Sequence, residues 1–88
     1  MNIIRNKDIA WQTVEGQVLI VTPDNSTIHI LNSTGSEIWG FLEKTKRSIE
    51  EIVSYVCDEF EVEKERAFEE VSKFIAELSD KGIILVEE

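Results

Sequence analysis

Cysteine and histidine each occur once among the 88 residues, as Cys57 and His29. One cysteine cannot form an internal disulfide or a site with several thiolate ligands. One histidine excludes the two-histidine motifs of zinc enzymes, and His29 and Cys57 do not stand at a metal-binding spacing. No glycine-rich phosphate loop is present. The sequence therefore predicts no metal, no cofactor and no catalytic residues, because no pair of nucleophile and base can be assembled.

Long hydrophobic runs are also missing. No apolar segment approaches the ~18 residues that a membrane-spanning helix needs. Residues 1–8 contain no long apolar core and no small-residue cleavage site, so they do not resemble a signal peptide. We therefore expect a cytoplasmic protein without a membrane partner. The length suits a single domain over residues 1–88.

Basic residues are few. The chain has 9 lysines and arginines against 18 aspartates and glutamates, so its net charge is −9. Such a surface repels phosphate backbones, which argues against a nucleic-acid partner. The same charge tolerates, and can attract, a basic or neutral peptide. It also serves simply to keep a small domain in solution.

The first third of the sequence is typical of β-strands. Residues 9–15, 18–22 and 26–31 are rich in β-branched and aromatic side chains. Gly16 and Gln17 offer a tight turn between the first two segments, and Pro23 with its neighbours breaks the second from the third. The three segments predict an antiparallel meander.

Two helix starts are indicated by the same spacing of residues. Thr34 and Glu37 stand three residues apart, as a capping box requires, and so do Ser48 and Glu51. The basic segment 44–47 suits the negative end of the first of these helices. Each predicted helix carries an apolar stripe, and Cys57 lies on the second one as a small hydrophobic residue.

A third helix is expected over residues 63–81. Gly82 follows it, where a left-handed residue commonly ends a helix. The apolar run 83–86 is then a short strand or a tail packed on the core. The predicted fold class is α+β and winged-helix-like, with a three-stranded antiparallel sheet followed by three helices and a short C-terminal strand.

Four segments resemble the PqqD family. Residues 31–39, Leu-Asn-Ser-Thr-Gly-Ser-Glu-Ile-Trp, follow its pattern of Leu-Asn, then Thr-Gly, then an apolar residue with tryptophan. Residues 48–53, 59–62 and 74–84 match the family in the same order, so that the resemblance covers nearly the whole chain. The chain departs from the family in the loop 44–47, which lacks a common glycine.

The resemblance implies a non-catalytic RiPP recognition element, a domain that binds the leader of a ribosomally made precursor peptide. In this family the leader adds as a strand beside the third strand and packs on the third helix. Its partner is a modifying enzyme: a leader peptidase, a cyclase or a radical-SAM protein. The product class stays open between a lasso peptide, a radical-SAM product and a quinone cofactor. The predicted peptide-binding residues are Thr27, Ile28, His29, Ile30, Leu31, Ala67, Glu70, Val71, Phe74 and Glu77.

Some of these positions have a second interpretation. The apolar members on the third helix also suit core packing, and His29 also suits an incidental strand position. Glu70 stands where many family members carry an aspartate, and Glu70 and Glu77 can meet a basic leader residue. A helix wheel leaves open which flank of the third helix faces the groove.

Two other functions compete with leader binding. A winged-helix nucleic-acid-binding domain fits the order of helices and strands, but the net charge of −9 opposes it. A generic protein-interaction domain is the second, since an exposed strand edge can pair with another copy of the chain.

Overall fold

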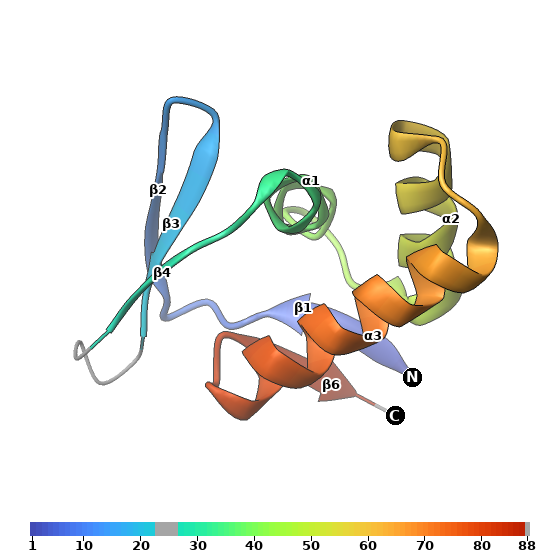
Figure 1. Cartoon of the computed structure of the whole chain (residues 1–88). Coiled ribbons are helices and arrows are strands. Elements are labelled where there is room, and N and C mark those ends of the chain that lie inside the picture. The colour runs from blue at the N-terminus through green and yellow to red at the C-terminus, as the bar shows by residue number, and fades with distance from the viewer. Residues whose placement is uncertain (23–26, 88) are drawn as a thin grey trace.

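The computed structural model describes residues 1–22 and 27–87. One end of the molecule is a three-stranded antiparallel meander in the order β2 (Ala10–Val14), β3 (Gln17–Val21) and β4 (Ile28–Ile30) (Figure 1). The predicted meander is therefore confirmed. The predicted break at Pro23 lies outside the described residues.

The turn between β2 and β3 sits one residue earlier than predicted. Glu15 and Gly16 are its two central residues, with φ values of 50° and 84°. Positive φ at both positions is the geometry whose twist matches that of the flanking strands. Glycine adopts it at no steric cost, which explains why Gly16 stands here.

A second sheet was not predicted. It has the order β5 (Arg47–Ser48), β1 (Asn2–Arg5) and β6 (Ile84–Glu87), and both of its pairings are antiparallel. β6 confirms the expected C-terminal strand. β1 and β5 have no strong strand signal in the sequence, because each is short and is held mainly by partners that are distant along the chain. Ile3 of β1 is nevertheless fully buried.

Three helices follow the meander: α1 (Ser33–Phe41), α2 (Ile49–Phe60) and α3 (Lys64–Asp80). The capping box predicted at Thr34 is wrong. Asn32 is the N-cap of α1, and its side-chain oxygen accepts a hydrogen bond of 2.8 Å from the Gly35 N–H. Asparagine caps helices as well as threonine does, and here it lies two residues earlier in the chain.

Two further helix signals are confirmed, the start of α2 and the end of α3. Ser48 and Glu51 form the predicted capping box, with reciprocal hydrogen bonds of 2.9 and 3.1 Å. Gly82 follows α3 with a φ of 74°, and the Ile83 N–H then bonds back to the Leu78 carbonyl at 2.9 Å. This reversal turns the chain directly from α3 into β6.

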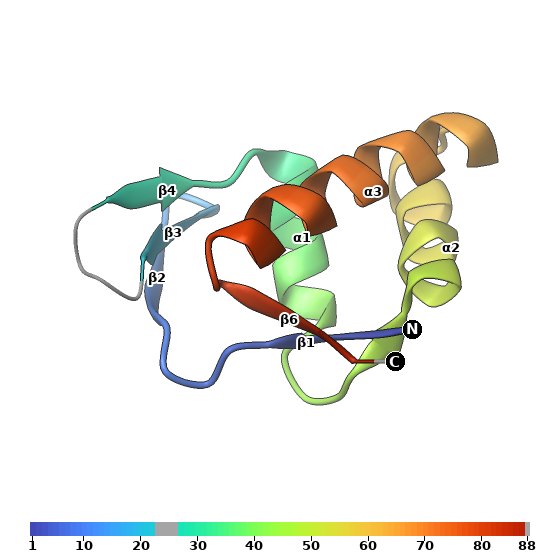
Figure 2. The ribbon, with the colours of Figure 1, turned by 90° about the horizontal axis from the view of Figure 1, so that it is seen from below.

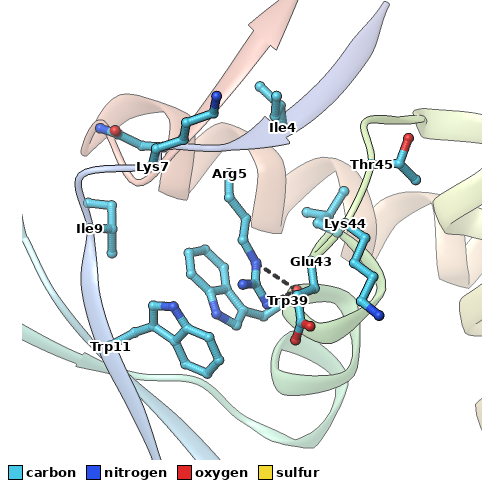
Figure 3. A pocket seen from close by; sticks show the side chains of 11 residues that line it. Ile4, Arg5, Lys7, Ile9, Trp11, Trp39, Glu43, Lys44 and Thr45 are labelled. Carbon is cyan, nitrogen blue, oxygen red and sulfur yellow. Dashed lines mark hydrogen bonds between the residues drawn. The ribbon is translucent and has the colours of Figure 1, made fainter.

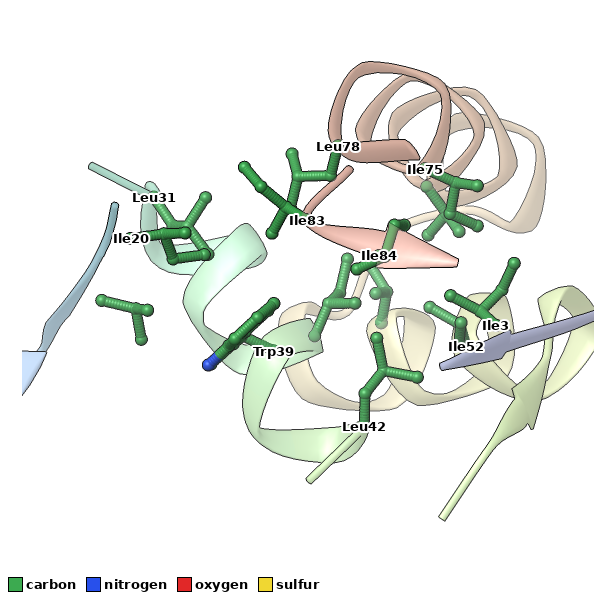
Figure 4. Close-up of a cluster of buried hydrophobic side chains, with 14 of the residues drawn as sticks. Ile3, Ile20, Leu31, Trp39, Leu42, Ile52, Ile75, Leu78, Ile83 and Ile84 are labelled. Carbon is green, nitrogen blue, oxygen red and sulfur yellow. The ribbon is translucent and has the colours of Figure 1, made fainter. Parts of the chain in front are cut away.

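The hydrophobic core joins both sheets to all three helices (Figure 4). Trp39 and Ile38 of α1 belong to this core and are almost fully buried. α3 runs from α2 toward the meander and contacts β6 (Figure 2). Within the ranges described, no helix is long and apolar enough to cross a membrane.

The contacts of α3 with α2 and β6 fix the rotation of α3 about its axis. This rotation decides which residues of α3 reach the surface.

Candidate functional site

Strand β4 has one open edge. In the described part of the chain it pairs with β3 alone, through Leu19↔Ile30, Ile20↔His29 and Val21↔Ile28. The flanking residues also bond to the β3 side: the Leu31 N–H donates to the Val18 carbonyl, and the Thr27 carbonyl accepts from the Thr22 N–H, each at 2.9 Å.

These bonds set the direction of the remaining backbone groups. In an antiparallel pair, residues alternate between those that bond to the neighbouring strand and those that point away from it. Because Thr27 and Leu31 bond toward β3, the N–H and C=O groups of Ile28 and Ile30 point to the open edge. Such an edge is a template for an added strand.

A hollow of about 290 Å³ begins two residues after β4. It lies between the start of α1 and one face of α3, and Phe74 is its half-buried aromatic side chain. Gly35 permits this geometry, because a Cβ at that position would lie 3.0 Å from Cε1 of Phe74. The residues that line the hollow are Asn32, Thr34, Gly35, Ile38, Glu70, Lys73, Phe74 and Glu77.

The structure divides the predicted α3 residues into two groups. Glu70, Phe74 and Glu77 line the hollow. Ala67 and Val71 are fully buried in the core, so the expectation that they line an open groove is corrected. Their side chains point into the core, which leaves the flank with Glu70, Phe74 and Glu77 at the surface.

The predicted β4 residues also differ in exposure. The side chains of Ile28 and Ile30 are each 62% exposed, whereas Leu31 is buried and His29 is half-buried. His29 lies opposite Ile20, a core residue, and therefore occupies the inner face of the sheet. Thr27 is exposed just before the strand.

The hollow carries a mixed charge with an acidic excess. Glu70 and Glu77 face one cation, Lys73, which sequence reasoning did not single out. Arg66 reaches Glu70 at 3.7 Å from the preceding turn, but both side chains are exposed, so this ion pair contributes little to stability. A ligand with a basic side chain therefore has a favourable position beside Glu77.

A second cavity, of about 300 Å³, surrounds Arg5 (Figure 3). The Arg5 guanidinium lies 4.7 Å from the centre of the Trp11 ring and 4.3 Å from that of Trp39. Its Nε donates to the Trp39 carbonyl at 2.9 Å, near the negative end of α1. Partial burial lowers the pKa of Arg5, while Glu43 acts in the opposite direction. We interpret this cluster as a structural link between β1, β2 and α1.

Neither cavity contains a recognisable catalytic set. Among residues 1–22 and 27–87, no group of three or more His, Cys, Asp and Glu side chains could hold a metal ion. Cys57 is half-buried and packs against the core. The arrangement at β4 and α3 offers backbone hydrogen bonds, an aromatic wall and charge, which are means of binding a peptide.

The fold and the site define a small winged-helix-like α+β domain whose meander ends in an open strand beside a helix-lined hollow. The chain matches the family described as Coenzyme PQQ synthesis protein D (PqqD) over residues 17–84, and it therefore belongs to the PqqD family. Among curated protein sequences, none matches it significantly.

One solved structure has the same fold. It is described as TbiB1 in complex with the TbiA(beta) leader peptide. The two chains superpose with a TM-score of 0.83 at 22% sequence identity, over 97% of this chain and 98% of the other. This likeness confirms the winged-helix-like α+β fold class.

Proposed function

We propose that this chain is a non-catalytic RiPP recognition element, a single domain over residues 1–88 that binds the leader of a ribosomally made precursor peptide. The observation that carries the proposal is the open edge of β4 beside the hollow on α3. Family membership and the leader bound to a protein of the same fold support it.

The proposed mode of binding is strand addition. The leader pairs with the outward N–H and C=O groups of Ile28 and Ile30, and these main-chain bonds supply affinity. Residues that continue past the strand then enter the hollow, where Phe74 offers an apolar wall and Glu70 and Glu77 attract a basic side chain. His29, Thr27 and Leu31 complete the strand, and Ala67 and Val71 hold α3 in place from the core.

The modifying chemistry belongs to a separate enzyme in this proposal. That partner is a leader peptidase, a cyclase or a radical-SAM protein, and the complex works in the cytoplasm without a cofactor on this chain. The recognition element holds the leader by its backbone, so that the rest of the precursor is free to enter the active site of the enzyme.

The test begins with a search of the neighbouring coding regions for a short precursor peptide. Its synthetic leader is then titrated into isotope-labelled protein. We expect the amide signals of Ile28 and Ile30 to shift and to become protected from hydrogen exchange, because they gain new acceptors. Trp11 and Thr13 on the opposite edge are the internal control and should change little. If the β4 amides stay unchanged at saturating leader, the proposal is wrong.

A further inference from the structure

The outer face of the meander carries exposed apolar side chains near the open edge of β4. Ile28 and Ile30 point outward from β4, and each is 62% exposed. They stand directly opposite Val21 and Leu19 of β3, which are only half-buried. A shallow hollow of about 210 Å³ lies on this face, lined by Ala10, Trp11, Gln12, Leu19, Val21 and Ile28.

This apolar face consists of two rows of cross-strand neighbours. One row runs through Ala10, Val21 and Ile28, and the other runs from the polar Gln12 through Leu19 to Ile30. Cross-strand pairs of apolar side chains are the unit by which a sheet gains stability. Each row ends at an isoleucine of β4 that has no neighbouring strand beyond it among the described residues. These two isoleucines are the most apolar residues of the strand.

The same two residues provide the open backbone groups. Because the N–H and C=O of Ile28 and Ile30 point to the edge, a strand that pairs there places residues directly opposite them. Side chains of an added strand alternate between the two faces, so every second one lies beside an exposed isoleucine. The residue between them lies on the inner face, beside the half-buried His29.

We infer that the leader carries aliphatic or aromatic side chains at two positions separated by one residue, and that these pack on Ile28 and Ile30. The inference rests on the proposed function and adds to it a requirement on the leader sequence. In this inference the outer face of the sheet and the hollow on α3 both contribute to selecting the leader. The apolar rows continue to the edge at which the leader is proposed to pair, so a leader bound there cannot avoid this face.

The test uses three substitutions of similar character. Ile28→Thr and Ile30→Thr each keep a β-branched residue in the strand but remove apolar surface. Val14→Thr is the matched control, because Val14 is 44% exposed on the same face but belongs to the opposite edge strand, β2. Far-UV circular dichroism and thermal unfolding confirm that each variant folds.

Affinity is measured by fluorescence anisotropy with the same synthetic leader, carrying a fluorescent label. We expect each isoleucine substitution to raise the Kd roughly threefold to tenfold, and Val14→Thr to leave it within a factor of about two. Replacing the two outward leader residues by threonine should weaken binding to the wild type but add little to the loss in the Ile28→Thr/Ile30→Thr variant.

The remaining outcomes separate this inference from the proposed function. If the leader shifts the β4 amides while both isoleucine variants bind as well as the wild type, the inference is wrong and the function stands. If no leader binds, both are wrong. If sedimentation shows a dimer that the two substitutions dissolve without a change in leader affinity, the face is a contact between copies of this chain, which also overturns the inference.

Discussion

At the scale of single residues, the two glycines of α1 have opposite surroundings. A Cβ at Gly35 would meet Phe74 at 3.0 Å and Asn32 and Leu31 at 3.3 Å, whereas a Cβ at Gly40 would meet nothing within 4 Å. Glycine inside a helix costs about 1 kcal/mol relative to alanine. At Gly40 no packing contact requires glycine, so the cost is not offset there. At Gly35 the close approach of Phe74 requires glycine.

We predict that Gly40→Ala raises the free energy of unfolding by about 0.5–1 kcal/mol. Gly35→Ala should give no such gain, because the added methyl group displaces the Phe74 ring and offsets the better helix propensity. Urea denaturation of the two variants measures both values. An equal stabilisation by the two substitutions would show that the contact between Gly35 and Phe74 has no energetic weight.

At the scale of elements, α1 and α2 are joined by a small aromatic cluster. The rings of Phe41 and Tyr55 stack with their centres 4.2 Å apart, and the Arg47 guanidinium lies 4.2 Å from the centre of the Phe41 ring. The Tyr55 hydroxyl donates a hydrogen bond of 2.8 Å to Glu37. This bond, together with desolvation and the negative charge of Glu37, raises the pKa of Tyr55 to about 12.

A raised folded-state pKa means that the neutral phenol is favoured by folding. The contribution of Tyr55 to stability is therefore complete below its unfolded pKa of about 10 and is lost as the pH rises through about 12. Tyr55 is the only tyrosine, so the tyrosinate absorbance reports it directly. We expect a midpoint near 12.

The variant Glu37→Gln tests the cause of this shift. It removes the negative charge, so the midpoint should fall toward the ordinary tyrosine value. Far-UV circular dichroism recorded along the same titration identifies the pH range in which the chain stays folded. An unchanged midpoint in the variant would mean that Glu37 does not hold the phenol in its neutral form.

At the scale of the whole molecule, the charge separates leader binding from nucleic-acid binding. The net charge is −9, and α3 carries Lys64, Arg66 and Lys73 among a larger number of acidic residues. Duplex DNA would have to approach this surface against electrostatic repulsion. The winged-helix-like fold by itself does not decide function.

We therefore predict no retardation of mixed-sequence DNA in a gel-shift experiment at low salt and micromolar protein. Low salt most favours contacts with phosphates, so weak nucleic-acid binding would be detected most readily under this condition. Binding of the leader by the same sample is the control that shows that the protein is folded. A shift at low protein concentration that is abolished by salt would contradict this prediction and support a nucleic-acid-binding domain.

The sequence alone determined the features whose causes lie within a few residues. The meander follows from β-branched runs separated by turn residues, the start of α2 from Ser48 and Glu51, and the end of α3 from Gly82. Even the misplaced start of α1 is a local matter, because Asn32 and Thr34 are both capable caps and differ by two positions. The strand and helix carrying the candidate site were recognised in this way.

Only the tertiary structure decided how these elements face one another. The sheet of β1 and β6 pairs Asn2 with Glu87 across almost the entire chain, and a short strand gives no local signal of such a partner. The rotation of α3 likewise buries Ala67 and Val71 and turns Phe74 to the hollow, although a helix wheel allows either flank. The physical reason is that a local pattern shows which residues are apolar, whereas the packing of distant elements decides which of these residues are buried.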